Sequence, residues 1–346
     1  MRTGVFFETF QAEERLWNSL PQRWWMAVFL VLLFTLPFWA SKYILAMACI
    51  IGIHVIATFG LNLTTGNAGL ISLSHGAFLG VGCYTVAYLG KMGVPFYITL
   101  PIAGSLAALL GVIVGLPSLR VKGIYLAIAT LAAHFLLTFL FREWGSVTGG
   151  IQGTNIPKAE LFGYQLTGDR DNFYLIFVVA LILGVAARNL ARTYIGRAFI
   201  AVRDRDISAE ILGVNLLRTK LLAFAIGAFY AGVAGGVLGY FYGAITPEYF
   251  ALTLSIFYLA AVIVGGLGSV LGSILGAVFM TFVPETLRLG ANAGAQWFPG
   301  LAGIVLPMGQ VVFGLLIIGF LVFEPHGLTA VWRRTKRVFH LWPFKT

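Results

Sequence analysis

The chain contains 346 residues, of which 59% are hydrophobic and 10% charged, and its formal net charge is +10. Soluble globular proteins carry about 25% charged residues, so this composition excludes a water-soluble fold. In a membrane protein a positive net charge is explained by the excess of Lys and Arg in cytoplasmic loops. We therefore expect a membrane protein with no nucleic-acid partner.

Apolar segments of roughly 20 residues recur along the chain, and each is long enough to cross about 30 Å of hydrocarbon as a helix. Helices are expected because lipid cannot hydrogen-bond an open backbone. The 42 glycines agree with close helix packing in a membrane. We predict an all-α polytopic membrane protein with about ten transmembrane helices, at residues 24–41, 44–63, 76–90, 96–116, 123–141, 173–190, 220–242, 251–267, 272–288 and 309–323.

Lys and Arg are distributed unevenly between the segments that join these spans. With a cytoplasmic N-terminus, 17 of the 23 lie on the cytoplasmic side and 6 on the other. By the positive-inside rule, both termini then face the cytoplasm. The predicted units are a cytoplasmic segment at 1–23, a transmembrane domain at 24–323 and a basic tail at 324–346 close to anionic lipid. Glu8, Glu13 and Glu14 precede the first span, which argues against a cleaved signal.

Two glycine-rich stretches, Thr64–Phe78 and Ile263–Ala277, interrupt the hydrophobic pattern and predict broken helices. Irregular backbone at membrane depth is tolerated where it is buried in protein or lines a cavity. Corresponding interruptions in two halves of a chain are typical of transporters with internal repeats. Close packing of small residues explains both stretches without a substrate, so both interpretations stay open.

Two segments between spans are long enough to contact other molecules. The external segment at 142–172 is either a docking or gating loop or a solvated connector. The cytoplasmic segment at 191–219 concentrates charges between two apolar spans, with alanines and glycines among them. It is either a docking helix for a cytoplasmic partner or a solvated connector.

Signals of catalysis are weak, and we expect no enzyme activity. The sequence contains no GxxxxGK[ST] nucleotide-binding loop and no HExxH zinc motif. Cys49 and Cys83 lie in apolar runs and are expected to be buried thiols, without a metal site. Glu285, His54 and His134 are candidate intramembrane relay groups. Glu285 has an alternative role as an ion-pair partner of Arg288, three residues further along the helix.

Several motifs occur in the order found in one family of permeases: GLISLSHGAFLGVGCYTVAYL (69–89), GLPSLRVKGIYLAIATL (115–131), TGGIQGTNIPKAELFG (148–163), GRAFIAVRDRDISAEILGVNLLRTKLLAFAIGAFYAGVAG (196–235), IVGGLGSVLGSILGA (263–277) and EPHGL (324–328). With these motifs the chain resembles the LivH/LivM permeases of branched-chain amino acid ABC importers, and LivM more than LivH.

The resemblance implies a permease in a bacterial inner membrane. Its partners would be a LivH-like second permease, two P-loop ATPase subunits and an external substrate-binding protein. The chain itself would bind no cofactor, and the partners would use ATP. The ATPase-coupling loop would consist of Gly196, Arg197, Ala198, Ala201, Arg203, Asp206, Ala209, Glu210 and Gly213.

The resemblance also suggests a candidate translocation path along the first broken stretch and the segment after Gly123. Its polar residues are Asn67, Ser72, Ser74, His75, Tyr125, Thr130 and His134. Ile124 and His134 stand where many relatives carry polar or acidic residues. The substrate therefore stays open between branched-chain or other hydrophobic amino acids and small solutes such as urea and short amides. A stand-alone secondary carrier and a non-transporting scaffold are the rival interpretations.

Overall fold

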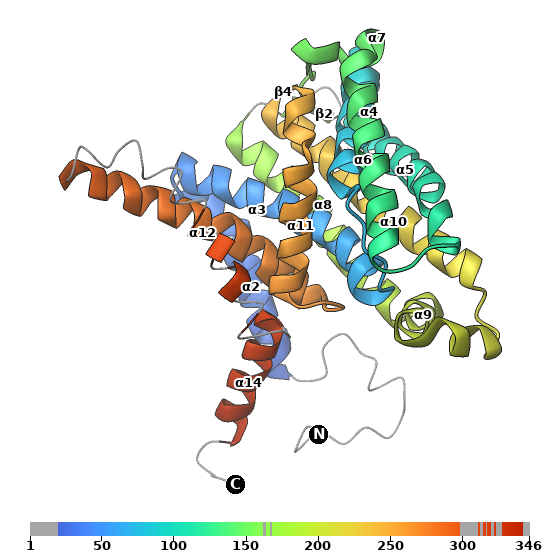
Figure 1. The fold of residues 1–346 in the computed structure, drawn as a ribbon. Coiled ribbons are helices and arrows are strands. Elements are labelled where there is room, and N and C mark those ends of the chain that lie inside the picture. Colours follow the sequence, from blue (N-terminus) through green and yellow to red (C-terminus); the bar gives the residue numbers. More distant parts are fainter. Residues whose placement is uncertain are drawn as a thin grey trace.

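Long helices make up most of the computed structural model (Figure 1), which describes residues 20–161, 164–166, 168–297, 311, 314–315, 317–319, 322 and 327–341. The long helices are α2 (Leu20–Trp39), α3 (Lys42–Leu61), α4 (His75–Lys91), α5 (Phe96–Gly115), α6 (Ile124–Glu143), α8 (Asp169–Arg192), α9 (Tyr194–Ile211), α10 (Leu216–Tyr242), α11 (Leu252–Gly265), α12 (Val270–Trp297) and α14 (Leu328–Leu341).

The remaining elements are short. A π-helical turn, η1 (Asn62–Asn67), continues α3, and α7 (Gly145–Thr148) is a single turn. The 3-10 turns are η2 (Leu116–Leu119), η3 (Gly150–Gln152) and η4 (Pro247–Phe250). The strands are β1 (Thr154–Asn155), β2 (Glu160–Leu161), β3 (Tyr164–Gln165) and β4 (Ala244–Ile245). β1 pairs antiparallel with β4, and β2 with β3.

The predicted class, a polytopic helical membrane protein, is confirmed. Within the described residues, six helices are long and apolar enough to cross a membrane: Lys42–Asn67, Phe96–Leu119, Ile124–Glu143, Asp169–Arg192, Leu216–Tyr242 and Val270–Gly290. Helices also occupy the predicted spans at 24–41, 76–90 and 251–267. The count of ten stays a prediction, because most of the span at 309–323 lies outside the described residues, as do residues 1–19 and the end of the tail.

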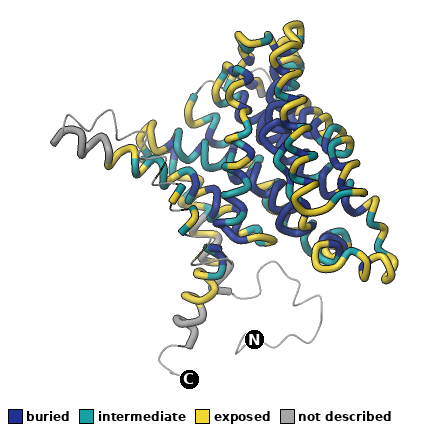
Figure 2. The backbone as a smooth tube through the Cα atoms, in the orientation of Figure 1, coloured by how far each residue is buried: buried dark blue, intermediate teal, exposed yellow. Residues whose placement is uncertain are grey.

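The outer helices expose apolar side chains that a soluble protein would bury. Leu109 and Ile113 on α5 and Ile182 on α8 are more than half exposed. In Figure 2 the exposed positions follow the outer faces of the bundle, whereas the buried positions gather at its centre. Apolar surface of this extent is stable against lipid, so the burial pattern agrees with the composition.

α10 is the central helix of the bundle, packed against α3, α4 and α5. More than half of its buried residues are glycine or alanine, which lets neighbouring backbones approach closely. A Cβ on Gly82 of α4 would overlap the carbonyl group of Gly232 on α10, and a Cβ on Gly235 would overlap the carbonyl of Leu79. The contact between α4 and α10 therefore requires glycine on both helices.

The segments predicted to be cytoplasmic and the segment predicted to be external lie at opposite ends of the bundle. α9 and α14 lie at one end, and α7 with the short strands lies at the other (Figure 1). The predicted external segment is not loose chain where the structure describes it. β1 pairs with β4 after α10, and Ile156 and Ala159 belong to the hydrophobic core.

Substitution of Gly82 by Ala tests the close approach of α4 and α10. The added methyl group has no room beside Gly232, and overpacking of this kind costs about 1–3 kcal/mol of stability. We expect a lower apparent melting temperature of the detergent-solubilised protein. Gly290→Ala on α12 is the control, because nothing lies within 4 Å of its Cβ position and alanine favours a helix. Equal melting temperatures for the two variants would contradict the packing described here.

Candidate functional site

Both predicted helix breaks are present, and they lie against each other. α3 ends in η1, and residues 68–74 are non-helical before α4 begins at His75. The second break separates α11 from α12 at residues 266–269. A π-helical turn in a membrane helix frequently marks a functional position. We call residues 62–69 and 266–273 together the break junction.

Asn62 holds the break junction together. Its side-chain amide donates to the Ser269 carbonyl oxygen at 2.7 Å and to Ser273 Oγ at 2.8 Å. Its Oδ1 accepts from the Gly268 N–H at 2.8 Å. Asn62 is buried, and a Cβ on Gly66 would overlap both Asn62 and Gly268. Sequence analysis did not single out Asn62, although an amide inside an apolar span is itself a signal of a buried polar contact.

A buried polar cluster surrounds the start of α4, immediately after the first break. The hydroxyls of Ser72 and Ser74 share a hydrogen bond of 3.1 Å. The Leu73 N–H donates to Thr130 Oγ1 on α6 at 3.0 Å. Side chains from another helix therefore satisfy part of the non-helical backbone, which the membrane interior requires.

Ser255 on α11 joins the start of α4 to α6. Its hydroxyl oxygen accepts from the Gly76 N–H at 2.8 Å and lies 3.4 Å from His134 Nδ1. A hydroxyl has one donor and two acceptor lone pairs, so Ser255 can serve the Gly76 N–H and His134 Nδ1 at the same time. His134 Nε2 is buried and has no hydrogen-bond partner among the described residues.

The other two intramembrane histidines have partners. His75 Nε2 donates to the Ala57 carbonyl at 2.9 Å, and His54 Nδ1 shares a hydrogen bond of 2.8 Å with the Tyr258 hydroxyl. The Tyr258 ring lies edge-on to both imidazoles. Glu285 on α12 pairs with Arg288 and accepts a hydrogen bond from Tyr43. These contacts agree with the ion-pair interpretation of Glu285.

The structure brings six of the seven candidate path residues to the start of α4 and the first break. Asn67, Ser72, Ser74, His75, Thr130 and His134 are all buried. Tyr125 is not part of this group, because its side chain is 74% exposed on the outward face of α6. Since the grouped side chains are covered on all sides, the cluster is closed to solvent in this conformation.

The predicted coupling residues lie on α9 and the turn after it. Arg197, Arg203, Glu210 and Gly213 are exposed, and Ala201 and Asp206 are half-buried. Gly196, Ala198 and Ala209 are buried against the chain itself. Ala198 and Ala209 therefore pack within this protein, and the assignment of all nine residues to an ATPase-coupling loop stays a prediction.

Three large apolar side chains are exposed near the end of α9, among the exposed charged ones. Ile207 is 69% exposed, and Ile211 and Leu212 are both 82% exposed. We call these three residues the α9 ridge. Positions 207 and 211 are one helical turn apart, a spacing that the sequence displays but that the surrounding charges obscure.

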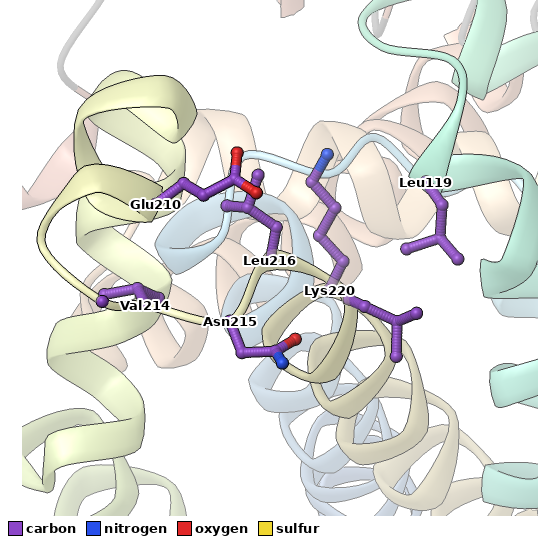
Figure 3. A pocket seen from close by; sticks show the side chains of 8 residues that line it. Leu119, Glu210, Val214, Asn215, Leu216 and Lys220 are labelled. Carbon is purple, nitrogen blue, oxygen red and sulfur yellow. The ribbon is translucent and has the colours of Figure 1, made fainter.

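A pocket of about 590 Å³ opens beside the α9 ridge (Figure 3). Its walls come from η2, the end of α9, the turn at 213–215 and the start of α10. Figure 3 shows Glu210 entering from α9 and Lys220 rising from α10 toward the gap between them. A partner residue seated here would contact apolar walls and groups of both charge signs.

Asp206 joins α9 to two other elements at this pocket. It pairs with Lys122, which precedes α6, and its Oδ2 lies 3.9 Å from the buried Nζ of Lys220. Lys220 Nζ also donates to the Ser118 carbonyl at 3.2 Å. The hydrogen bond from Lys122 is the main cause that lowers the pKa of Asp206 below its ordinary value of 3.8. Asp206 therefore stays ionised at neutral pH.

The comparisons with known proteins agree on one family. The family model described as branched-chain amino acid transport system / permease component matches residues 43–321. The high-affinity branched-chain amino acid transport system permease protein LivM of Escherichia coli strain K12 is 35% identical over 296 residues, covering 78% of this chain and 70% of that protein.

Two further relatives extend the match. LivM of Salmonella typhimurium strain LT2 is 34% identical, with 78% of this chain and 70% of that protein covered. The probable branched-chain amino acid transport permease protein LivH of Methanocaldococcus jannaschii is 28% identical, with 82% of this chain and 91% of that protein covered. No solved structure matches the chain significantly.

Substitution of Ser255 by Ala tests the polar cluster. The Gly76 N–H and His134 Nδ1 lose their shared partner, and leaving buried groups unsatisfied costs about 1–3 kcal/mol. We expect the apparent melting temperature to fall by several degrees. Thr281→Ala is the matched control, because that hydroxyl bonds only to the Ala277 carbonyl of its own helix. If the cluster is as described, the apparent melting temperature falls further for Ser255→Ala than for Thr281→Ala.

Substitution of Asp206 by Asn tests the ion pairs of α9. Because the folded-state pKa of Asp206 is lowered, the ionised form stabilises the fold above pH 3.8, and this contribution is lost as the pH falls through the lowered value. We expect the variant to melt about 1–3 °C below the wild type at pH 7. The difference should close as the pH falls well below 3.8.

Asp204→Asn is the control for this measurement. Among the described residues Asp204 pairs only with Arg203 on the surface, and 63% of its side chain is exposed, so we expect no measurable change. A difference between wild type and Asp206→Asn that widens toward acidic pH would contradict the pairing with Lys122.

Proposed function

The chain belongs to the family of branched-chain amino acid ABC transport permeases, and from this membership we propose how it works within an importer. It is the permease subunit, and its substrate is a branched-chain or other hydrophobic amino acid. The substrate follows from the relatives, because LivM and LivH are both named for branched-chain amino acid transport. Localisation in a bacterial inner membrane, with both termini cytoplasmic, completes the proposal.

The observation that carries the docking proposal is the α9 ridge. Ile207, Ile211 and Leu212 present an apolar surface at the end of the bundle, on a helix rich in charge. Exposed apolar side chains rimmed by polar ones are typical of protein interfaces. An ATPase subunit would bury the ridge in a groove and place one of its own residues in the pocket beside Glu210 and Lys220.

The energy for transport would come from partner chains. The sequence has no GxxxxGK[ST] loop, so ATP would be bound by two docked ATPase subunits. Closure of the ATPase pair would move α9, and the spans that pack on it would rock between inward-open and outward-open arrangements. The buried cluster around Ser72 and His134 would be closed to solvent in one arrangement and open in another.

Two other partners would complete the importer. A LivH-like permease would cover an exposed flank of the bundle, and the outward face of α6 is a suitable surface. Ile128, Leu136 and Phe139 there are all more than half exposed. An external binding protein would deliver the substrate at the opposite end from α9. A pocket of about 300 Å³ lies there between the start of α5 and the folded segment at 157–160.

Paired substitutions on the α9 ridge test the docking step. Ile211→Asp with Leu212→Asp places two charges where an apolar contact is proposed, so the tagged protein should lose its ATPase subunits during affinity purification from native membranes. Replacement of both residues by Met is the matched control, because Met keeps an apolar side chain of similar volume. We expect this control to retain the ATPase subunits.

The same purification separates the proposal from its rivals. Recovery of no nucleotide-binding chain with the wild type would favour a secondary carrier or a scaffold and would overturn the proposed function. Equal recovery with the Asp and Met variants would move the docking site away from the α9 ridge. Transport of radiolabelled leucine by the reconstituted complex would then test the substrate class.

A further inference from the structure

Arg203 reaches from α9 into the break junction. Its NH1 donates to the Gly66 carbonyl oxygen at 2.8 Å, a backbone acceptor in the π-helical turn η1. Its aliphatic stem lies directly over Gly69, where a Cβ would come within 2.6 Å of Arg203 Cγ. On the second break, NH1 lies 3.4 Å from the Cβ position of Gly268. One side chain thus contacts the first break and lies close to the second.

The two breaks are themselves joined one layer deeper. Asn62 bonds to Gly268, Ser269 and Ser273, so a displacement of one break displaces the other. Residues 68–74 lead from Gly66 to the hydroxyls of Ser72 and Ser74. A continuous route therefore runs from α9 through Arg203 to Gly66 and Gly69, and along the following residues to the buried polar cluster at the start of α4. Asn62 ties this route to the second break.

We infer that Arg203 is the positioning residue through which movement of α9 is transmitted to both helix breaks. Its guanidinium binds a backbone carbonyl of its own chain, so its main role is internal and differs from that of the exposed α9 ridge. The charge-assisted hydrogen bond and the close fit over Gly69 make the contact directional. Movement of α9 then changes the break junction, and the junction changes access to the polar cluster.

The neighbouring arginine is a matched control. Arg205 is exposed at the kink of α9 and has no hydrogen bond or ion pair to the described residues. Arg205→Ala removes the same charge and a side chain of the same size as Arg203→Ala. A difference between the two variants therefore reports the contact with Gly66 and Gly69, and the loss of a cytoplasmic cation is common to both.

The inference rests on the proposed function, and its test uses the whole importer in proteoliposomes. Backbone hydrogen exchange is compared between the nucleotide-free and ATP-bound complex, over residues 194–211 and over both parts of the break junction. In the wild type we expect ATP to change exchange in both regions. In Arg203→Ala the change should persist on α9 and disappear at the junction, and Arg205→Ala should behave as the wild type does.

Transport gives a second readout. Leucine taken up per ATP hydrolysed should fall about tenfold in Arg203→Ala, within the range typical of coupling between two sites. Arg203→Lys should recover part of this loss, because Lys keeps the charge and a donor but lacks the planar guanidinium. ATPase subunits should co-purify with Arg203→Ala, Arg203→Lys and Arg205→Ala.

A double substitution distinguishes transmission from a folding defect. Gly69→Ala has two costs, a strained backbone at φ +70° and displacement of the Arg203 stem. Arg203→Ala removes the second cost, so the double variant should lose less coupling than the product of the two single losses. A simple product would contradict the contact.

The alternative outcomes are distinct. Loss of ATPase subunits with Arg203→Ala, but not with the wild type, would make Arg203 a docking contact and overturn the inference alone. An ATP-dependent change at the junction that survives Arg203→Ala would also overturn it. Absence of ATPase subunits from the wild-type preparation would instead overturn the proposed function, and the inference with it.

Discussion

Irregular backbone inside a bilayer must find its hydrogen-bond partners within the protein, and this constraint shapes the centre of the molecule. The chain interrupts two helices and places the interruptions against each other, and the side-chain amide of Asn62, in the first, bonds to the backbone of the second. Hydroxyls from neighbouring helices satisfy the backbone that follows. Thr130 accepts from Leu73, and Ser255 accepts from Gly76. The polar groups at the breaks are thus structural supports as well as candidate path residues.

Close packing by small residues makes this arrangement sterically feasible. α10 passes through the bundle on a face rich in glycine and alanine, which draws α3, α4 and α5 around it. Because α3 and α4 flank the first break, their distance from α10 determines where the break lies. Small residues on α9 have a similar role, since Ala198 and Ala209 allow that helix to lie against the bundle. α9 consequently turns its larger apolar side chains, Ile211 and Leu212, outward.

α9 is kinked at Arg205, and the two sides of the kink have different contacts. Before the kink, Arg203 donates to the Gly66 carbonyl in the first break. After the kink, Ile207, Ile211 and Leu212 are exposed, and we propose that they bind a partner. Asp206, held ionised beside Lys122, ties α9 to the segment before α6 and to the start of α10. In the importer that we propose, alternating access depends on events in other chains, and a mechanical connection of this kind would carry them to the spans.

The sequence alone determined the class of this protein, because hydropathy and length dictate helices in lipid wherever they occur. Its glycine-rich interruptions also located both breaks, and its motifs indicated the family. Tertiary structure decided which side chains meet. Asn62 and Ser255 are ordinary polar residues until two distant helices place them beside unpaired backbone groups. Tyr125 lies apart from the buried candidate residues, and Ala198 and Ala209 turn inward, because burial depends on neighbouring helices, which no local pattern encodes.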